Sequence, residues 1–295
     1  MASILITGAS GLIGSHLQEY LRNKNQRVLT LSRTTSNNND TFVWDVDTKK
    51  IDEDAIKNAD YIIHLAGAGI ADKYWTRKRK KEIIYSRTKS TQLLIDTIKQ
   101  HNPNLKGFIA VSGVGAYGIK PSQKVFTEED DYGKGYTAAV CRLWEKESLK
   151  CSELNIRTTI FRLGVVYSDQ GGAFEKIKKP IKYNVGASLG SGKQYMPWIH
   201  IEDLCELIYK AVEDESMEGI YNAVAPEHIT NKEVTIQLAS SLNKNIWMPN
   251  IPSFVMQMLY GEMSSILLKG NKVSSEKTQK TGFNFKYSRL QECFN

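Results

Sequence analysis

Three glycines near the N-terminus constrain the fold of this chain more than any other feature. They occupy positions 8, 11 and 14 of the run Gly8-Ala9-Ser10-Gly11-Leu12-Ile13-Gly14, directly after the apolar segment Ser3–Thr7. Apolar residues then recur at helical spacing up to position 21, and a second apolar segment covers residues 27–31. A strand, a glycine turn, a helix and a second strand within about thirty residues are typical of one βαβ unit.

Each glycine of this turn has a separate role in such a unit. Gly8 permits the sharp turn out of the strand, Gly11 lets a pyrophosphate approach the backbone, and Gly14 lets the helix pack closely. The helix N-terminus adds unpaired N–H groups and the positive end of its dipole. A purely structural turn is the alternative, but the flanking strand and helix favour a dinucleotide site. We assign that site to Gly8, Ser10, Gly11, Leu12, Ile13 and Gly14.

The rest of the chain continues the alternation of strands and helices. Strands are predicted at 60–66, 107–112 and 156–162, and helices at 75–100 and 136–153. This pattern indicates an α/β fold of Rossmann type, with a doubly wound parallel sheet.

Beyond Gly164 the pattern loosens into glycine-rich loops, with a short strand at 197–201 and a helix at 203–214. The stretch 247–295 differs again, with two prolines and an apolar helix at 254–260. We expect a dinucleotide-binding domain over 1–225, with intervening substrate-side segments, and a small C-terminal α/β lobe over 246–295.

The end of the second strand indicates which dinucleotide binds. An NAD site usually places Asp or Glu there for the ribose 2′-hydroxyl, whereas this strand ends in Leu31-Ser32-Arg33. An arginine beside a hydroxyl can hold a 2′-phosphate through charge-assisted hydrogen bonds. Ser32 and Arg33 therefore predict NADP in preference to NAD, with a plain surface role for Arg33 as the alternative.

Composition argues against several other classes of protein. No run of about 18 apolar residues is present, so no membrane span is expected, and no signal-peptide pattern precedes the first strand, so we expect a cytoplasmic protein. The four cysteines and five histidines show no metal-ligand spacing, so no metal is expected. The net charge is +7, and its one dense cluster, residues 73–81, is interpreted as a solvated helix face near an anionic cofactor and not as a nucleic-acid surface.

Beyond the turn, the chain resembles the extended, epimerase-like branch of the short-chain dehydrogenase/reductase superfamily. Its glycine spacing is that branch's form of the turn, and residues 64–69, 112–118, 162–167 and 198–204 look like later motifs of the branch. It is similar in particular to the group called epimerase family proteins, some of them labelled nucleoside-diphosphate-sugar epimerases. Residues 65–70, 86–87, 140–145 and 189–192 carry this closer resemblance, and the tail from Gly261 to Phe283 resembles that group's C-terminal domain.

The resemblance implies further residues around the cofactor. Leu65, Ala66 and Gly67 would line the ribose side, and Val166 would flank the nicotinamide end. Glu82 and Arg87, on one face of the long helix, would reach the bound dinucleotide. Ordinary core packing is the alternative for Leu65, Ala66 and Val166, and a solvated helix face is the alternative for Glu82 and Arg87.

The catalytic pattern departs from this family. The superfamily uses Tyr-x-x-x-Lys, in which the lysine lowers the pKa of the tyrosine so that the phenolate can act as acid or base. Here Tyr136 is present but position +4 is Val140, and the usual serine position holds Gly113, one residue after Ser112. Tyr136, Ser112 and Tyr117 are therefore alternative candidates for proton transfer, and a plain aromatic at the start of a helix is the other interpretation of Tyr136.

Two functions of different class are compatible with these residues. The first is an NADP-dependent, epimerase-like oxidoreductase acting on a small polar molecule, with a nucleotide-sugar as one candidate. The second is an NADP-binding sensor or regulatory protein that has lost the Tyr-Lys pair. A nucleic-acid-binding role ranks third, since it depends on net charge alone. We expect a small-molecule substrate, no nucleic-acid or membrane partner, and allow for a homodimer.

Overall fold

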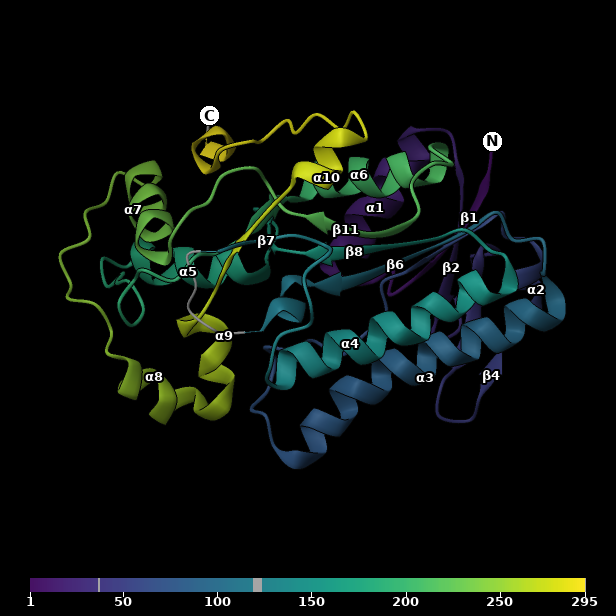
Figure 1. Cartoon of the computed structure of the whole chain (residues 1–295), viewed down its shortest axis with the longest axis horizontal. Helices are drawn as coiled ribbons and strands as arrows, with labels where there is room; N and C mark the ends of the chain where they lie inside the picture. The colour runs from purple at the N-terminus through teal and green to yellow at the C-terminus, as the bar shows by residue number, and fades with distance from the viewer. Residues whose placement is uncertain (37, 119–123, 295) are drawn as a thin grey trace.

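The chain folds around one large, almost entirely parallel sheet (Figure 1). A computed structural model describes residues 1–36, 38–118 and 124–294. Along the sheet the strands follow the order β11-β8-β6-β5-β1-β2-β3-β4, and only β4 runs antiparallel to its neighbour. The strands are β1 (Ser3–Thr7), β2 (Arg27–Ser32), β3 (Thr41–Asp45), β4 (Lys50–Ile51), β5 (Tyr61–His64), β6 (Gly107–Gly113), β8 (Thr158–Leu163) and β11 (Gly219–Ala223).

The strand order reverses between β1 and β5. From β1 the chain builds outward through β2 and β3, then returns to the other side of β1 and builds outward through β5, β6, β8 and β11. In open parallel sheets the loops at such a reversal diverge and leave a crevice at the carboxyl ends of the strands. The glycine turn leaves the sheet at this point.

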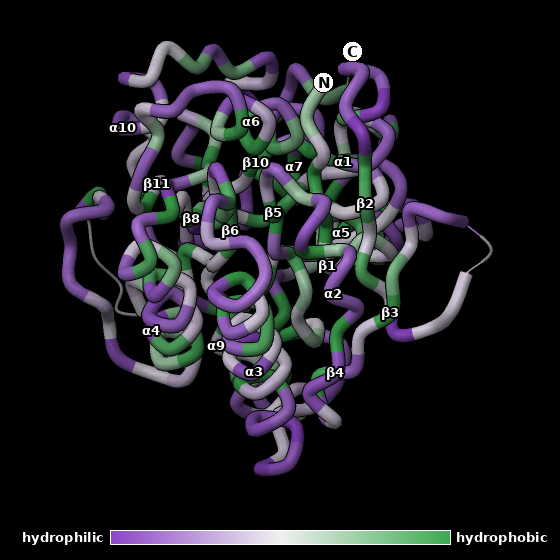
Figure 2. Tube along the Cα trace, turned by 90° about the vertical axis from the view of Figure 1, so that its right-hand side faces the viewer, coloured by the Kyte–Doolittle hydropathy of each residue, from purple (hydrophilic) through white to green (hydrophobic). Residues whose placement is uncertain are grey.

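The central strands are buried because helices cover both faces of the sheet. In β1, Ile4 and Ile6 face one core with Leu17 and Leu207, whereas Leu5 faces the other core. Alternate residues of a strand point to opposite faces, so a strand buried on both sides is continuously apolar. Figure 2 shows the hydrophobic colour gathered along these central strands.

Helices cover both faces of the sheet (Figure 1). On one face lie α1 (Leu12–Asn23) and α6 (Ile201–Glu213). On the other lie α2 (Glu53–Lys57), α3 (Arg77–His101) and α4 (Tyr136–Ser148). This is the three-layer arrangement that the sequence pattern predicts.

A smaller lobe with its own core follows the carboxyl end of β8. Parallel strands β9 (Val165–Tyr167) and β10 (Trp198–His200) pack with α5 (Gly172–Lys182) and α7 (Asn231–Ser241). The C-terminal segment comprises α8 (Ser253–Tyr260), η3 (Gly261–Ser264), α9 (Ser265–Leu268), β12 (Lys272–Val273), α10 (Glu276–Lys280) and η4 (Leu290–Phe294). It crosses back to the main domain, where β12 pairs with β7 (Val125–Phe126).

A buried polar network lies beneath the carboxyl end of the sheet. Glu145 of α4 and Arg162 of β8 form an ion pair at 2.9 Å with almost no exposed surface on either side chain. The hydroxyls of Ser112 and Tyr132 donate to the same carboxylate at 2.7 and 2.5 Å. This satisfies a charge that would otherwise be costly to bury, and it links β6, β8 and α4.

Asn222, a fully buried residue of β11, connects the C-terminal segment to the sheet. Its side-chain oxygen accepts from the Tyr117 hydroxyl at 2.6 Å, and its amide nitrogen donates to the carbonyl of Ser274 at 3.1 Å. Its backbone carbonyl accepts from the hydroxyl of Thr278 at 2.7 Å. One asparagine thus holds together three segments that are far apart in the sequence.

The doubly wound fold is confirmed, and several smaller elements differ from the sequence prediction. The helix predicted at 136–153 ends at Ser148 and continues as a 3₁₀ helix, η2 (Leu149–Leu154). The glycines 171 and 172 were expected to mark a loop, but their positive φ angles form the sharp turn into α5, which begins at Gly172. Among the described residues, no helix is long and apolar enough to cross a bilayer, and no group of His, Cys, Asp or Glu is arranged to hold a metal.

Candidate dinucleotide and substrate site

The glycine turn has the close contacts that only glycine permits. Gly8 has a φ of +70°, and a Cβ there would lie 2.9 Å from the backbone nitrogen of Ala66. A Cβ on Gly14 would lie 2.7 Å from the Cα of Ala9, so the helix packs against the turn's own backbone. A Cβ on Gly11 would meet only the Gly8 carbonyl within 4 Å, so the outer side of the turn is open.

The loop after β5 is held against this turn. The backbone nitrogens of Leu65 and Ala66 donate to the carbonyl and hydroxyl oxygens of Thr7, both at 3.2 Å. The Thr7 hydroxyl is in turn 2.7 Å from Nδ1 of His64, a fully buried ring whose pKa is lowered to about 3 by burial. The neutral imidazole therefore serves as a fixed hydrogen-bonding partner that orients Thr7. Leu65 and Ala66 therefore lie directly beside the glycine turn.

Ser32 and Arg33 leave the sheet beside the same turn. Leu31 of β2 pairs with Thr7 of β1, so the residues that follow each of them emerge at one edge. The Ser32 hydroxyl accepts from the backbone nitrogen of Thr34 at 3.1 Å, and Arg33 is exposed. An exposed guanidinium at this edge is available to an incoming phosphate.

Arg87 is a buried residue of α3 and not part of a solvated face. It is 9% exposed, and its Nη1 donates to the carbonyls of Ala68 and Ile83 at 2.9 and 3.0 Å. Its guanidinium lies 4.7 Å from the Trp144 ring centroid, and a Cβ on Gly67 would lie 3.1 Å from its Cζ. Arg87 therefore supports the Gly67–Ala68 loop from below.

Val166 lies near the start of α1, which follows the glycine turn. It is in β9, paired with Ile199, and packs against the core that contains β1. A Cβ on Gly172 would lie 3.0 Å from Leu12 Cδ2 and 3.7 Å from the carbonyl oxygen of Val166. The start of α5 thus brings Val166 and Leu12 close together. The cofactor candidates of the turn, the β5 loop and β9 therefore gather at the strand reversal.

Tyr136 stands at the start of α4, against the N-terminal part of α3. Its hydroxyl donates to the carbonyl of Lys80 at 2.9 Å, and its ring packs edge-on against Trp75 at a centroid distance of 4.7 Å. Burial raises the pKa of Tyr136, while Arg87 and Arg79 act in the opposite direction. Two arginines thus supply positive charge near this hydroxyl, although Val140 occupies the position of the family's lysine.

The hydroxyls of Ser112 and Tyr117 are engaged inside the fold. Ser112 donates to Glu145, and Tyr117 donates to Asn222, with burial raising the pKa of Tyr117 to about 12. Gly113 faces more open space, since a Cβ there would have its nearest neighbours at 3.8 and 3.9 Å. The three catalytic candidates therefore lie in different surroundings, with Tyr136 apart from the buried network.

A groove of about 790 Å³ opens between the start of α3 and the C-terminal segment. Its lining residues come from the loop after β5, from α3 and from α8 and η3: Ala71, Asp72, Lys73, Tyr74, Thr76, Lys78, Arg79, Glu82, Tyr260 and Met263. Glu82 lies here, and its carboxylate accepts from Arg79 at 2.7 Å. The sequence prediction of a solvated face for residues 73–81 is wrong for Arg79, which is 7% exposed.

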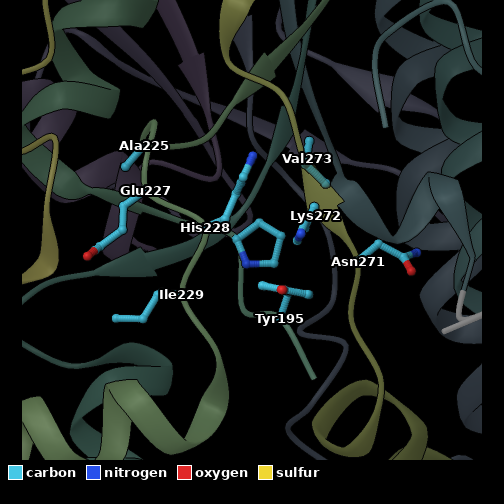
Figure 3. Close-up of a pocket in the computed structure, with 9 residues that line it drawn as sticks. Tyr195, Ala225, Glu227, His228, Ile229, Asn271, Lys272 and Val273 are labelled. Atoms are coloured by element: carbon cyan, nitrogen blue, oxygen red, sulfur yellow. The ribbon is translucent and has the colours of Figure 1, made fainter. Parts of the chain in front are cut away.

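A second, narrow pocket lies where the C-terminal segment meets the smaller lobe (Figure 3). The Nζ of Lys272 lies 4.9 Å from the Tyr195 ring centroid, and the carboxylate of Glu227 and the amide of Asn271 point to opposite sides. Glu227 accepts from the backbone of Leu290 at 2.8 Å, and Asn271 donates to the carbonyl of Gly118 at 2.9 Å. Glu227 and Asn271 therefore join segments of the chain.

Apart from Glu82, which was predicted as a cofactor contact, the groove residues were not recognised as site residues from the sequence. The basic run 73–81 was visible, but the position of Tyr260 and Met263 beside it depends on how the C-terminal segment crosses back. An ion pair between Lys80 and Glu262 spans this junction.

Comparison with known proteins agrees with the fold. The model of the NAD-dependent epimerase/dehydratase family matches residues 4–223, and a domain of unknown function (DUF1731) matches residues 251–295. An Arabidopsis thaliana protein, "Epimerase family protein SDR39U1 homolog, chloroplastic", is 34% identical over 99% of this chain and 85% of its own. The Bacillus subtilis epimerase family protein YfhF is 32% identical over 98% of this chain and 95% of its own.

A solved structure of similar shape is human epimerase family protein SDR39U1 (isoform 2) with NADPH. It superimposes with a TM-score of 0.87 at 28% identity, covering 99% of this chain and 97% of that one. The similarity therefore extends over the sheet, the smaller lobe and the C-terminal segment alike. By its sequence, its fold and the geometry of its glycine turn, the chain belongs to the NAD-dependent epimerase/dehydratase family, among the epimerase family proteins that carry this C-terminal domain.

Proposed function

We propose that the protein is an NADP(H)-dependent, epimerase-like oxidoreductase acting on a small polar substrate. The observation that carries the proposal is the glycine turn at the strand reversal, whose outer side is open and whose flanking positions exclude side chains. NADP(H) fits this cradle, because Ser32 and Arg33 leave the adjacent strand beside it. When bound, the nicotinamide would supply hydride transfer. The NADPH in the human family member supports the same choice.

The residues of this chain would bind and orient the cofactor. The backbone N–H groups at the start of α1 would face the pyrophosphate, and Arg33 would bind the 2′-phosphate. Arg87 would hold the Gly67–Ala68 loop in place beside the ribose. Tyr136 is the candidate proton donor, because its hydroxyl lies beside the N-terminal part of α3 and near the charges of Arg87 and Arg79.

Cofactor choice is tested by Arg33→Ala. Loss of a charge-assisted contact costs about 1.5–3 kcal/mol, so calorimetric titration should show NADPH affinity falling about 10- to 100-fold, with NADH affinity nearly unchanged. Arg27→Ala is the matched control, since Arg27 is an exposed arginine at the opposite end of β2. Equal losses for NADPH and NADH would contradict the assignment.

Catalysis is tested by Tyr136→Phe. Nicotinamide absorbance would be followed with NADPH and a panel of carbonyl compounds and nucleotide-sugars. Removing the hydroxyl should reduce turnover by about 10²- to 10⁴-fold while NADPH affinity stays unchanged. Turnover that survives this substitution would exclude Tyr136 as the proton donor.

An NADP-binding sensor is the second candidate function. The specific observation in its favour is that Val140 replaces the family's lysine and that Ser112 and Tyr117 already donate inside the fold. Tight NADPH binding with no turnover on the whole panel would favour the sensor. The domain boundaries at 225 and 246, a homodimer and a cytoplasmic location stay predictions.

A further inference from the structure

The groove between α3 and the C-terminal segment has the size and composition of a small-molecule site. Its volume of about 790 Å³ lies in the range of known ligand pockets, roughly 300–1,000 Å³. One wall comes from the loop after β5 and the first turns of α3, and the other from Tyr260 and Met263. Figure 1 shows the start of α3 and the α8–α9 region at the same side of the molecule.

Arg79 is the fixed positive charge of this groove. Its Nη2 donates to the carbonyl of Gly69 at 2.6 Å and its Nη1 donates to Glu82 at 2.7 Å. Its buried Nε has no hydrogen-bond partner in the part of the chain that the structure describes. Arginine carries five N–H donors in a rigid fork, so this buried side chain keeps donors in excess of its acceptors. A pre-positioned, incompletely paired guanidinium is suited to an anionic group.

Further charges in the wall reinforce this preference. Lys73 and Lys78 are exposed and line the same groove, against the carboxylates of Asp72 and Glu82. Asp72 stands 3.9 Å from the Arg79 guanidinium, at the limit of an ion pair. Three cations face two anions, so one positive charge is left for a ligand to balance.

Both walls of the groove also carry aromatic or apolar side chains. Tyr74 is 62% exposed and Tyr260 is 36% exposed, and both line the groove with Met263. Exposed rings of this kind offer flat surfaces against which another ring can stack. An entirely polar ligand would leave them without a contact.

We propose that this groove binds an organic anion that has a phosphate or carboxylate at Arg79, Lys73 and Lys78 and a flat ring against Tyr74 and Tyr260. The assignment rests on the proposed function, in that this ligand is the substrate held beside the cofactor. The charged group would fix one end of the ligand, and the ring contacts would fix the other end.

The test uses 2-naphthyl phosphate as the probe, titrated into protein saturated with NADPH. Uncharged 2-naphthol serves as the matched ligand control. The phosphate should bind at least tenfold more tightly than the naphthol, and the difference should shrink as salt is added. Similar affinities for both would overturn the proposal. Competition between 2-naphthyl phosphate and NADPH would also overturn it, because the groove would then belong to the cofactor.

Variants locate the probe. Arg79→Met should weaken 2-naphthyl phosphate at least tenfold, and the double variant Lys73→Gln/Lys78→Gln, which changes only exposed side chains, should weaken it severalfold. Lys81→Gln is the control, an exposed lysine of the same helix outside the groove. Probe affinity unchanged in both the arginine and the double variant would refute the site.

NADPH affinity is measured on each variant and separates the two proposals. A protein that binds NADPH but not the probe refutes the groove alone. A protein that binds neither NADPH nor NADH refutes the proposed function.

Discussion

The ion pair between Glu145 and Arg162 should be among the costliest single interactions to break in this protein. Glu145 accepts four hydrogen bonds, two from Arg162 at 2.9 and 3.0 Å and one each from Ser112 and Tyr132. Arg162→Met removes two of them and leaves a carboxylate with no exposed surface and no counter-charge. Removing one partner of a buried pair costs about 3–5 kcal/mol.

That cost can be expressed as a change in melting temperature. An unfolding entropy of about 2.1 cal/mol/K per residue gives roughly 0.6 kcal/mol/K for 295 residues, so the midpoint should fall by about 5–8 °C. Differential scanning calorimetry measures this directly. Lys280→Met is the matched control, because its ion pair with Glu276 is exposed and screened by solvent, so the melting temperature should hardly change.

A double-mutant cycle then isolates the pair. Glu145→Gln in the Arg162→Met background removes the unpaired charge. The loss in unfolding free energy of the double variant should therefore be smaller than the sum of the losses of the two single variants, by about 2 kcal/mol or more. Additive losses, or a loss below about 1 kcal/mol for Arg162→Met, would show that the two charges do not depend on each other.

Three further predictions concern the dinucleotide region. Gly14→Ala should abolish measurable NADPH binding in a calorimetric titration, because its Cβ would lie 2.7 Å from the Cα of Ala9 and force the turn open; binding within twofold of the parent protein would contradict this. Gly113→Ser should leave the melting temperature within about 1 °C, since the nearest atoms to a Cβ there are 3.8 Å away and φ is −150°; a loss of several degrees would mean that the site is closed. His64 has its pKa lowered to about 3, against about 6.5 in the unfolded chain, so between these values only the unfolded state binds the proton and stability falls as the pH drops. In His64→Gln the unfolding free energy, measured by urea denaturation, should therefore depend less on pH between pH 6 and pH 4, by up to about 1.4 kcal/mol per pH unit. The same pH dependence in the variant and the parent protein would refute a neutral His64 ring.

Local sequence patterns were enough to predict the geometry of the glycine turn in the first βαβ unit. A side chain at Gly14 would meet the turn itself, and one at Gly8 would meet the loop after the adjacent strand β5. The spacing of the glycines is therefore enough to predict both positions. Ser32 and Arg33 follow for the same reason, because parallel pairing of β1 with β2 fixes where they emerge.

The remainder depends on contacts between distant segments. Ser112 looked like a catalytic candidate because it lies one residue before the family's serine position, but its partner Glu145 lies 33 residues further along the chain. Arg79 looked solvated because its neighbours in sequence are lysines, yet it turns inward to the carbonyl of Gly69. Neither partner can be recognised from periodicity, since both depend on how α3 and α4 pack against the sheet.

The position of Asn222 has a consequence for biosynthesis. Its hydrogen bonds to Ser274 and Thr278 cannot form until those residues have left the ribosome, although β11 itself emerges about fifty residues earlier. During that interval Asn222 would have Tyr117 as a partner but would lack Ser274 and Thr278, so the last strand of the main domain would be fully secured only after the C-terminal segment has emerged. The time at which the sheet is completed would then depend on how fast the ribosome synthesises the C-terminal segment, as well as on the stability of the fold.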